Sequence, residues 1–292
     1  MQIVISASRR TDIPAFYSDW FIDRLGAGYF NLTNPFNGRV RKVRVNKTEV
    51  HSIVFWSKNY APLLSRMSRL KGWRLFFHFT LNSEDTLLEP GVPPLAARCE
   101  QMRQLVGMFG PLAVRWRFDP VACYELQGRK RDNLGDFEML LDFAAGLGLT
   151  GCTVSFMDFY RKIEARQKKI PGFRFLYPKS SEMIETASRM AGLAAECGIT
   201  LFTCCEPELV QAGIENLAPA GCIDHNLLMG LYGTGLSCKA DKGQRRASGC
   251  LCHESIDIGS YRRQPCKGGC LYCYANPSQP QPPRGLLNRQ GG

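Results

Sequence analysis

The chain has 292 residues, of which 45% are hydrophobic and 22% charged, a composition that is ordinary for a globular protein. No apolar run approaches the roughly 20 residues of a membrane-spanning helix and no signal peptide is visible, so we predict a cytoplasmic protein with no membrane segment. The net charge of +11 makes nucleic acid one candidate partner, although a basic surface can also serve solubility alone.

Short apolar segments alternate with longer amphipathic ones over the first 204 residues. The predicted strands are residues 2–7, 29–33, 52–56, 74–80, 112–118, 152–156 and 199–204. The predicted helices between them lie near residues 16–26, 59–71, 92–109, 132–147 and 180–197. Gly148 and Gly198 stand where a glycine is expected to end the last two helices. This alternation predicts an α/β fold with a parallel sheet covered by helices.

Seven strands of this kind predict a complete or partial (β/α) barrel, with a doubly wound open sheet as the alternative. We expect the barrel over residues 1–204 and a cysteine-rich segment that completes it over residues 205–276. Residues 277–292 are rich in Pro and Gly and are expected to form a disordered tail. Residues 39–47 are expected to form a strand with a basic face.

Polar residues gather where the predicted strands end, which is where a (β/α) barrel carries its chemistry. Side chains alternate along a strand, so we expect Arg115, Arg117 and Asp119 to face the barrel interior while their apolar neighbours face the helices. An Arg–Asp ion pair that bridges two strand ends, with a purely structural role, is the alternative. The candidate substrate and cofactor contacts at the strand ends are Arg9, Arg10, Lys58, His78, Arg117 and Asp119.

The chain ends in three cysteines at C-x3-C-x2-C spacing, Cys266, Cys270 and Cys273, with Tyr272 just before the third. Clustered cysteines in a cytoplasmic protein bind metal more often than they form disulfides. Three thiolates can hold three corners of a [4Fe–4S] cluster and leave the fourth iron open for chemistry. A zinc site with His253 as the fourth ligand is the alternative.

Other cysteines precede this terminal triad in the sequence: Cys204, Cys205, Cys222, Cys238, Cys250 and Cys252. Four of them could hold a second iron–sulfur cluster or a structural zinc ion. Zinc sites usually use paired C-x2-C motifs, which are absent here, so the spacing favours iron and sulfur. The remaining four thiols fall in helical or strand patterns and are expected to be buried as small hydrophobic groups: Cys99, Cys123, Cys152 and Cys197.

Longer segments carry a resemblance that extends to Asn276. They are residues 6–17, 34–37, 54–59, 204–206, 222–225, 244–261 and 266–276. In these segments the chain resembles a bacterial family defined as domain of unknown function 1848, whose C-terminal cysteines are similar to those of radical S-adenosylmethionine (SAM) enzymes. Residues 270–274 and 117–120 resemble, more loosely, spore photoproduct lyase and its relatives. This looser resemblance makes nucleic acid a candidate substrate.

The resemblance implies a radical SAM-type barrel whose cluster loop has moved to the C-terminus, as in a circular permutation. Residues 255–259 would then supply the strand that precedes the loop, although no Gly-Gly-Glu motif for SAM is present. The implied cofactors are SAM and two [4Fe–4S] clusters. The implied ligands of the second cluster are Cys204, Cys222, Cys250 and Cys252, and Tyr272 would lie near the adenine of SAM.

We therefore hypothesise a radical SAM enzyme that cleaves SAM reductively to methionine and a 5′-deoxyadenosyl radical. An electron donor such as flavodoxin or ferredoxin is implied as a partner. The expected catalytic residues are Arg117, Asp119 and His78, and the expected cofactor contacts are Tyr272, Arg9, Arg10 and Lys58. The alternative is a non-catalytic iron–sulfur or zinc protein that binds nucleic acid. The substrate and the oligomeric state stay open.

Overall fold

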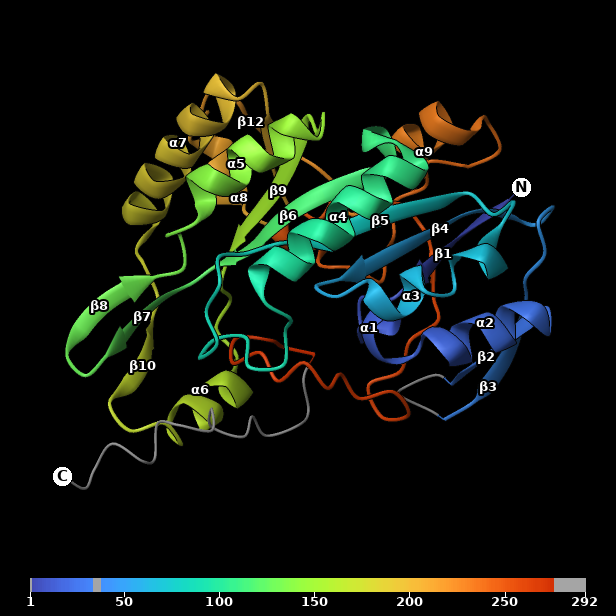
Figure 1. Cartoon of the computed structure of the whole chain (residues 1–292), viewed down its shortest axis with the longest axis horizontal. Helices are drawn as coiled ribbons and strands as arrows, with labels where there is room; N and C mark the ends of the chain where they lie inside the picture. The colour runs from blue at the N-terminus through green and yellow to red at the C-terminus, as the bar shows by residue number, and fades with distance from the viewer. Residues whose placement is uncertain (1, 34–37, 276–292) are drawn as a thin grey trace.

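A computed structural model describes residues 2–33 and 38–275 (Figure 1). Its centre is an eight-stranded sheet in the order β12-β11-β9-β6-β5-β4-β1-β13, in which all paired strands run parallel. Its strands are β1 (Ile3–Ala7), β4 (Val50–Ser57), β5 (Leu75–Thr80), β6 (Val114–Val121), β9 (Gly151–Phe156), β11 (Thr200–Thr203), β12 (Leu217–Pro219) and β13 (Ile256–Asp257). The predicted α/β class with a parallel sheet is confirmed.

The sheet is open. Within the described residues no pairing joins β12 to β13, which form its two edges, so a complete closed barrel is not found. These edge strands are three and two residues long and offer few hydrogen bonds for closure. From β13 to β12 the neighbours otherwise follow chain order without the reversal that defines a doubly wound sheet, so that alternative is wrong.

The long helices cover one face of the sheet, whereas α9 packs on the opposite face (Figure 1). The longest are α4 (Leu95–Phe109), α5 (Phe137–Gly146) and α7 (Ser180–Glu196). The shorter ones are α1 (Ile13–Phe16), α2 (Ser18–Gly26), α3 (Ala61–Leu64), α6 (Arg161–Gln167), α8 (Pro207–Gln211) and α9 (His225–Tyr232), with 3₁₀ turns η1 (Met67–Leu70), η2 (Pro111–Ala113) and η3 (Arg246–Ser248). Gly148 and Gly198 follow α5 and α7 with φ of 75° and 66°, as the capping argument predicts.

One predicted sheet strand lies elsewhere. β2 (Tyr29–Thr33) pairs antiparallel with β3 (Val40–Arg44) in a separate two-stranded sheet, so its place in a parallel barrel was wrong. The sequence also missed an antiparallel sheet of β7 (Cys123–Leu126), β8 (Arg129–Asp132) and β10 (Phe173–Leu176). β3 confirms the basic strand, with its Lys and Arg side chains exposed. The 34–37 motif and the 277–292 tail lie outside the described residues.

The two faces of β6 separate as its alternation predicts. Val114, Trp116 and Phe118 are buried in the main core with the helices. On the opposite face a second apolar cluster joins the sheet to the segment after β12. Its buried members are Val4, Val54, Phe76, Ile223, Leu228, Cys250 and Cys252. The cysteine-rich segment therefore packs on the face of the sheet that the long helices leave uncovered.

The last strand of the chain lies beside the first. Ile5 and Ser6 of β1 are in register with Ile256 and Asp257 of β13. The Asp257 carboxylate accepts hydrogen bonds from Ser6 Oγ (3.0 Å), Ser8 Oγ (2.6 Å) and the Arg9 backbone N–H (2.9 Å). The predicted strand before the cysteine loop is thus present, and side chains as well as backbone fix it to β1.

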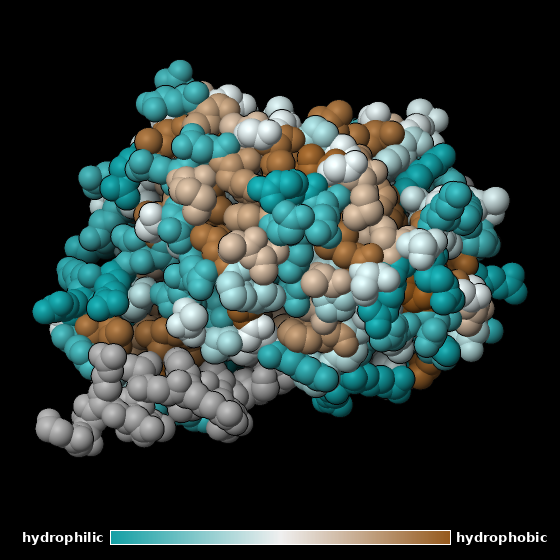
Figure 2. All heavy atoms as spheres, in the orientation of Figure 1, coloured by the Kyte–Doolittle hydropathy of each residue, from teal (hydrophilic) through white to brown (hydrophobic). Residues whose placement is uncertain are grey.

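Hydrophilic and hydrophobic residues are intermixed on the visible face of the molecule (Figure 2). Among the described residues, no helix combines the length and the apolar character that crossing a membrane requires.

Candidate metal centres and the cavity beside them

The terminal triad lies on the loop that follows β13. Cys270 is 6% exposed, whereas Cys266 and Cys273 are partly exposed. A Cβ atom placed on Gly268 would lie 3.6 Å from Cys266 Sγ and 3.8 Å from Cys270 Sγ, so both thiols turn toward this glycine. The loop therefore offers at least two thiols on one side, with a residue between them that has no side chain.

Hydrogen bonds to the backbone fix this loop. Arg166 of α6 donates from Nη1 to the carbonyl oxygens of Cys270 (3.3 Å), Leu271 (2.9 Å) and Cys273 (2.8 Å). The Leu271 N–H donates to Leu88 O at 2.9 Å. Because these bonds hold the main chain, the thiols keep their positions without depending on one another.

Tyr272 is buried in a polar network rather than exposed beside the triad. Its hydroxyl donates to Glu89, which also accepts from Lys58 Nζ at 2.9 Å. Asn82 Nδ2 lies 3.2 Å from the tyrosine hydroxyl, and Arg98 Nη1 lies 3.8 Å from the second Glu89 oxygen. Burial alone would raise the pKa of Glu89, but Lys58, the tyrosine hydrogen bond and Arg98 together hold that pKa below its usual value.

The second group of cysteines is the most compact set of ligand atoms in the described part of the chain. The thiols of Cys204, Cys205 and Cys250 all lie within 4.8 Å of one another. Cys204 Sγ is 3.7 Å from Cys205 Sγ and 3.8 Å from Cys222 Sγ. Hydrogen bonds with the Cys204 and Cys222 thiols lower the pKa of Cys252 below its ordinary value.

The structure thus brings the four implied ligands of the second group together, and it adds Cys205, which was not in the implied ligand set. Cys205 has a φ of 63°, in the left-handed region. Cys238 is engaged elsewhere, because its thiol donates to Asn226 Oδ1 at 3.2 Å.

Arg117 and Asp119 of β6 lie between the two groups of cysteines. Arg117 is buried; its Nη1 donates to Cys222 Sγ at 3.2 Å and its Nε to Asp119 Oδ2 at 3.2 Å. Burial would lower the pKa of Arg117, but Cys222 and Asp119 raise it well above its ordinary value. The Asp119 N–H donates to Asn82 Oδ1 at 2.9 Å, and Asn82 reaches Tyr272. Arg117 and Asp119 form an ion pair, but both belong to β6, so the pair does not bridge two strand ends as the alternative from the sequence had it.

His78 of β5 lies on the same face of the sheet as Arg117. Its Nε2 lies 2.7 Å from Cys222 O and its ring stacks on Trp56 with 5.0 Å between centroids. A carbonyl accepts, so Nε2 carries the hydrogen and Nδ1 is the acceptor. Burial, reinforced by Arg117, lowers the pKa of His78 to about 3. The ring is therefore neutral near pH 7.

Arg9 and Arg10 connect the end of β1 to the C-terminal segment. Arg9 Nη2 donates to Ser255 Oγ at 3.0 Å and lies 3.4 Å from Asp241 Oδ2. Arg10 Nη1 donates to Gly259 O at 3.2 Å. Both arginines thus brace β13, and a contact with SAM stays a prediction for them.

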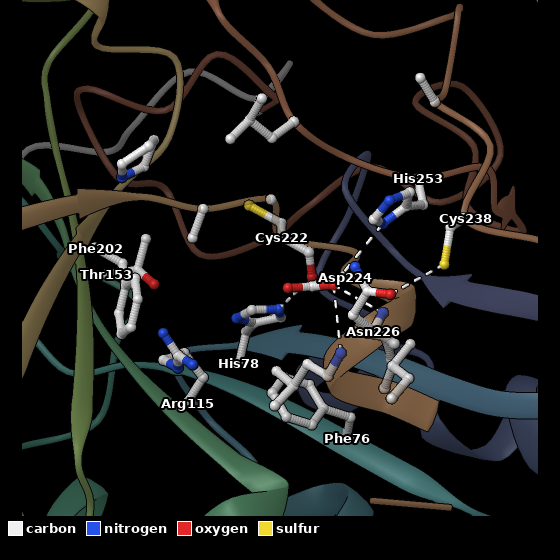
Figure 3. Close-up of a pocket in the computed structure, with 18 of the residues that line it drawn as sticks. Phe76, His78, Arg115, Thr153, Phe202, Cys222, Asp224, Asn226, Cys238 and His253 are labelled. Carbon is white, nitrogen blue, oxygen red and sulfur yellow. Dashed lines mark hydrogen bonds and ion pairs between the residues drawn. The ribbon is translucent and has the colours of Figure 1, made fainter. Parts of the chain in front are cut away.

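A cavity of about 600 Å³ lies between the inner face of the sheet and the segment after β12 (Figure 3). His78, Arg115 and Thr153 line it from the sheet, and Cys222, Asp224 and His253 line it from the other side. His253 Nδ1 accepts from the His225 N–H at 3.0 Å. The Nδ1 atom of His253 is therefore engaged within the C-terminal segment, and zinc binding by His253 together with the terminal triad stays an untested alternative.

The model of a family described as a domain of unknown function (DUF1848) matches residues 4–275. The chain belongs to this family.

Among solved structures, this DUF1848 chain is similar to a D-hydantoinase from a Bacillus sp. AR9, with 13% identity, a TM-score of 0.33, and coverage of 59% of this chain and 39% of that one. It is also similar to a dihydropyrimidinase from Brevibacillus agri NCHU1002, with 14% identity, a TM-score of 0.33, and coverage of 66% and 47%. The chain spans less than half the length of either enzyme. No curated protein matches it.

Several residues of this DUF1848 site carry no signal in the sequence. Glu89 and Asn82 lie in the long connection between β5 and α4, and Arg166 lies in a short helix. A buried charge is recognisable only once its partners are placed, and Lys58 is 31 positions away from Glu89 in the chain. The DUF1848 fold thus presents two groups of thiols, one polar network between them and a cavity beside the second group.

Proposed function

We propose that this protein is a radical SAM enzyme whose [4Fe–4S] cluster is held by Cys266, Cys270 and Cys273. The observation that carries the proposal is the cysteine loop itself, which hydrogen bonds to its backbone fix beside the edge of a parallel sheet with the Cys266 and Cys270 thiols turned toward the same glycine. When bound, such a cluster supplies the reductive cleavage of SAM to methionine and a 5′-deoxyadenosyl radical.

The order of the sheet supports a permuted partial barrel. Read from β13, the neighbours are β1, β4, β5, β6, β9, β11 and β12, so the strand before the cysteine loop stands first. This is the place that the unpermuted radical SAM order gives to the strand before its cluster loop. In the same orientation, the polar residues that end β4 and β6 lie next to the loop.

The chain's own residues have separate parts in this proposal. Lys58 and Tyr272, both oriented by Glu89, stand beside the triad and are assigned to SAM, together with Arg9 and Arg10. Arg117, Asp119 and His78 face the inner side and are assigned to the substrate. A flavodoxin or ferredoxin would supply the electron. The exposed cations of β3 keep nucleic acid among the candidate substrates.

The second group of cysteines is proposed to hold a metal centre. Its Sγ–Sγ distances of 3.7 and 3.8 Å are near the edge of about 3.8 Å that zinc–sulfur bonds of about 2.3 Å give to a tetrahedral site. An iron–sulfur cluster contains several metal ions and holds its thiolates farther apart. The spacing therefore supports zinc, which the sequence offered as the alternative to a second cluster.

Replacing Cys250 with Ala is expected to release this metal and leave the iron of the triad in place. Cys250 is buried in the apolar cluster that joins the segment after β12 to the sheet, so we also expect that segment to become sensitive to limited proteolysis. Zinc and iron per chain are measured by elemental analysis. Cys238→Ala is the control, because its thiol bonds only Asn226 in the described structure. Equal metal contents in all three proteins would contradict the assignment.

The proposed activity is tested by one anaerobic assay. The protein is reconstituted with iron and sulfide, SAM and a strong reductant are added, and 5′-deoxyadenosine is quantified. We expect the nucleoside to form, and we expect SAM to change the electron paramagnetic resonance spectrum of the reduced cluster. Iron-loaded protein that shows neither the nucleoside nor the spectral change would exclude the radical SAM assignment.

A further inference from the structure

Arg115 is a cation on the inner wall of the cavity. It belongs to β6, and its side chain extends toward the cavity between His78 and Phe202 (Figure 3). Its Cζ lies 4.2 Å from the centroid of the Phe202 ring. When a guanidinium lies over an aromatic face, its N–H bonds point outward, parallel to the ring. These donors therefore stay available for a further partner.

The charge of Arg115 forms no ion pair in the described part of the chain, although Asp224 acts on it from a distance. Within the described residues, no hydrogen bond or ion pair of its guanidinium is formed, while burial lowers its pKa from an ordinary value that is far above neutrality. Asp224 is the one carboxylate in the described cavity wall, and it already caps α9 by accepting from the N–H groups of Asn226 (2.9 Å) and Leu227 (3.3 Å). The guanidinium is partly buried and faces the cavity, so an oxyanion bound there would meet its N–H donors directly.

The structure makes room for this arrangement. A Cβ atom on Gly151 would lie 2.8 Å from Phe202 Cε2 and 3.2 Å from Arg115 Cζ, so the stacked pair occupies the space of a missing side chain. The cavity of about 600 Å³ is within the range of about 300 to 1,000 Å³ typical of small-molecule sites. Its apolar wall includes Phe76, Leu227 and Leu228.

We propose that Arg115 binds the carboxylate or phosphate group of a small molecule whose apolar part lies against this wall. The guanidinium fork can give two parallel hydrogen bonds to either oxyanion. The volume admits a small molecule and excludes a nucleic-acid duplex. Cys222 lines the same cavity and its carbonyl holds His78, so the ligand lies beside the second group of cysteines. That this ligand is the substrate rests on the proposed radical SAM function; the oxyanion site itself does not.

The test is a binding titration with two probes, phenyl phosphate and benzoate, by calorimetry at constant ionic strength in chloride. We expect saturable binding of at least one probe at one site per chain. Arg115→Met keeps an apolar contact with Phe202 and removes the donors, and we expect it to weaken binding by about 10- to 100-fold. Arg69→Met removes an equal charge from an exposed position and is expected to bind as the wild type does.

Arg115→Lys serves if the Met variant does not fold, because it keeps the charge and loses the fork, and it should bind several-fold more weakly than the wild type. Preference for phenyl phosphate would identify a phosphorylated ligand, and preference for benzoate a carboxylic acid. No saturable binding of either probe, or equal losses in Arg115→Met and Arg69→Met, would overturn the proposal. The titration needs no SAM cleavage, so its result stands apart from the activity assay.

Discussion

The Cys270→Ala variant is expected to form no 5′-deoxyadenosine above the blank in the anaerobic assay. Cys270 is the most buried thiol of the triad, and its carbonyl is held by Arg166, so no neighbouring residue is placed to replace its sulfur. With two thiolates left, the loop cannot hold three irons of a cubane and keep the fourth open. We expect iron at the triad, measured after reconstitution, to be lost together with the activity.

Cys197→Ala is the matched control for this result. Its thiol lies at the end of α7, where it donates to Asp142 Oδ1 at 3.6 Å, away from both groups of cysteines. The control removes one thiol of equal size and should keep both iron and activity. Nucleoside formation by Cys270→Ala at the rate of this control would contradict the ligand assignment.

Periodicity located the strands of the main sheet well because both faces of a parallel sheet are covered and its strands are continuous apolar runs. β5 is buried at every position, and the segment 74–80 was recognised for that reason. The same apolar character misplaced β2, where Phe30 is buried under α2 but the strand pairs with β3. A strand of a local hairpin and a strand of a parallel sheet can have the same residue types. Which strand it pairs with depends on contacts with the rest of the fold.

Sequence spacing identifies one group of thiols, and only the folded structure identifies the other. The terminal triad lies within eight residues, so spacing alone defines it. The second group comes from the residues after β11, the turn after β12 and the segment before β13, and its membership depends on packing. Cys205 therefore had no visible distinction from Cys238 in the sequence, although one contacts Cys204 at 3.7 Å and the other bonds Asn226.

A polar network of hydrogen bonds connects the residues at the strand ends and lies between the two groups of cysteines. Asn82 accepts from the Asp119 N–H and donates to Glu89 Oε1 at 2.8 Å, so one side chain connects the β6 ion pair with the residues around Tyr272. A change of charge at either end is transmitted through short, buried hydrogen bonds, where the local dielectric is low. Hydrogen bonds thus connect the surroundings of the two cysteine groups, with Glu89 as the carboxylate beside the triad.

Replacing Glu89 with Gln is expected to destabilise the protein by about 3 to 5 kcal/mol at pH 7, since removal of one partner leaves Lys58 with no full counter-charge in a buried site. The side chain of Glu89 is 4% exposed, and Gln keeps its shape while losing its charge. The free energy of unfolding is measured by urea denaturation under anaerobic conditions. Glu125→Gln is the control, because its carboxylate pairs with Arg174 at the surface and contributes little.

The pH dependence separates a lost charge from a lost shape. The folded-state pKa of Glu89 lies below its unfolded value of about 4.3, so the stability from its charge is present above that pH and is lost as the pH falls through the lower, folded value. The wild type should therefore approach the Glu89→Gln variant in stability only in acid, below about pH 4. A difference in the free energy of unfolding that stays constant from pH 7 into acid would show that Gln disturbs packing. It would contradict a stabilising role for the charge of Glu89.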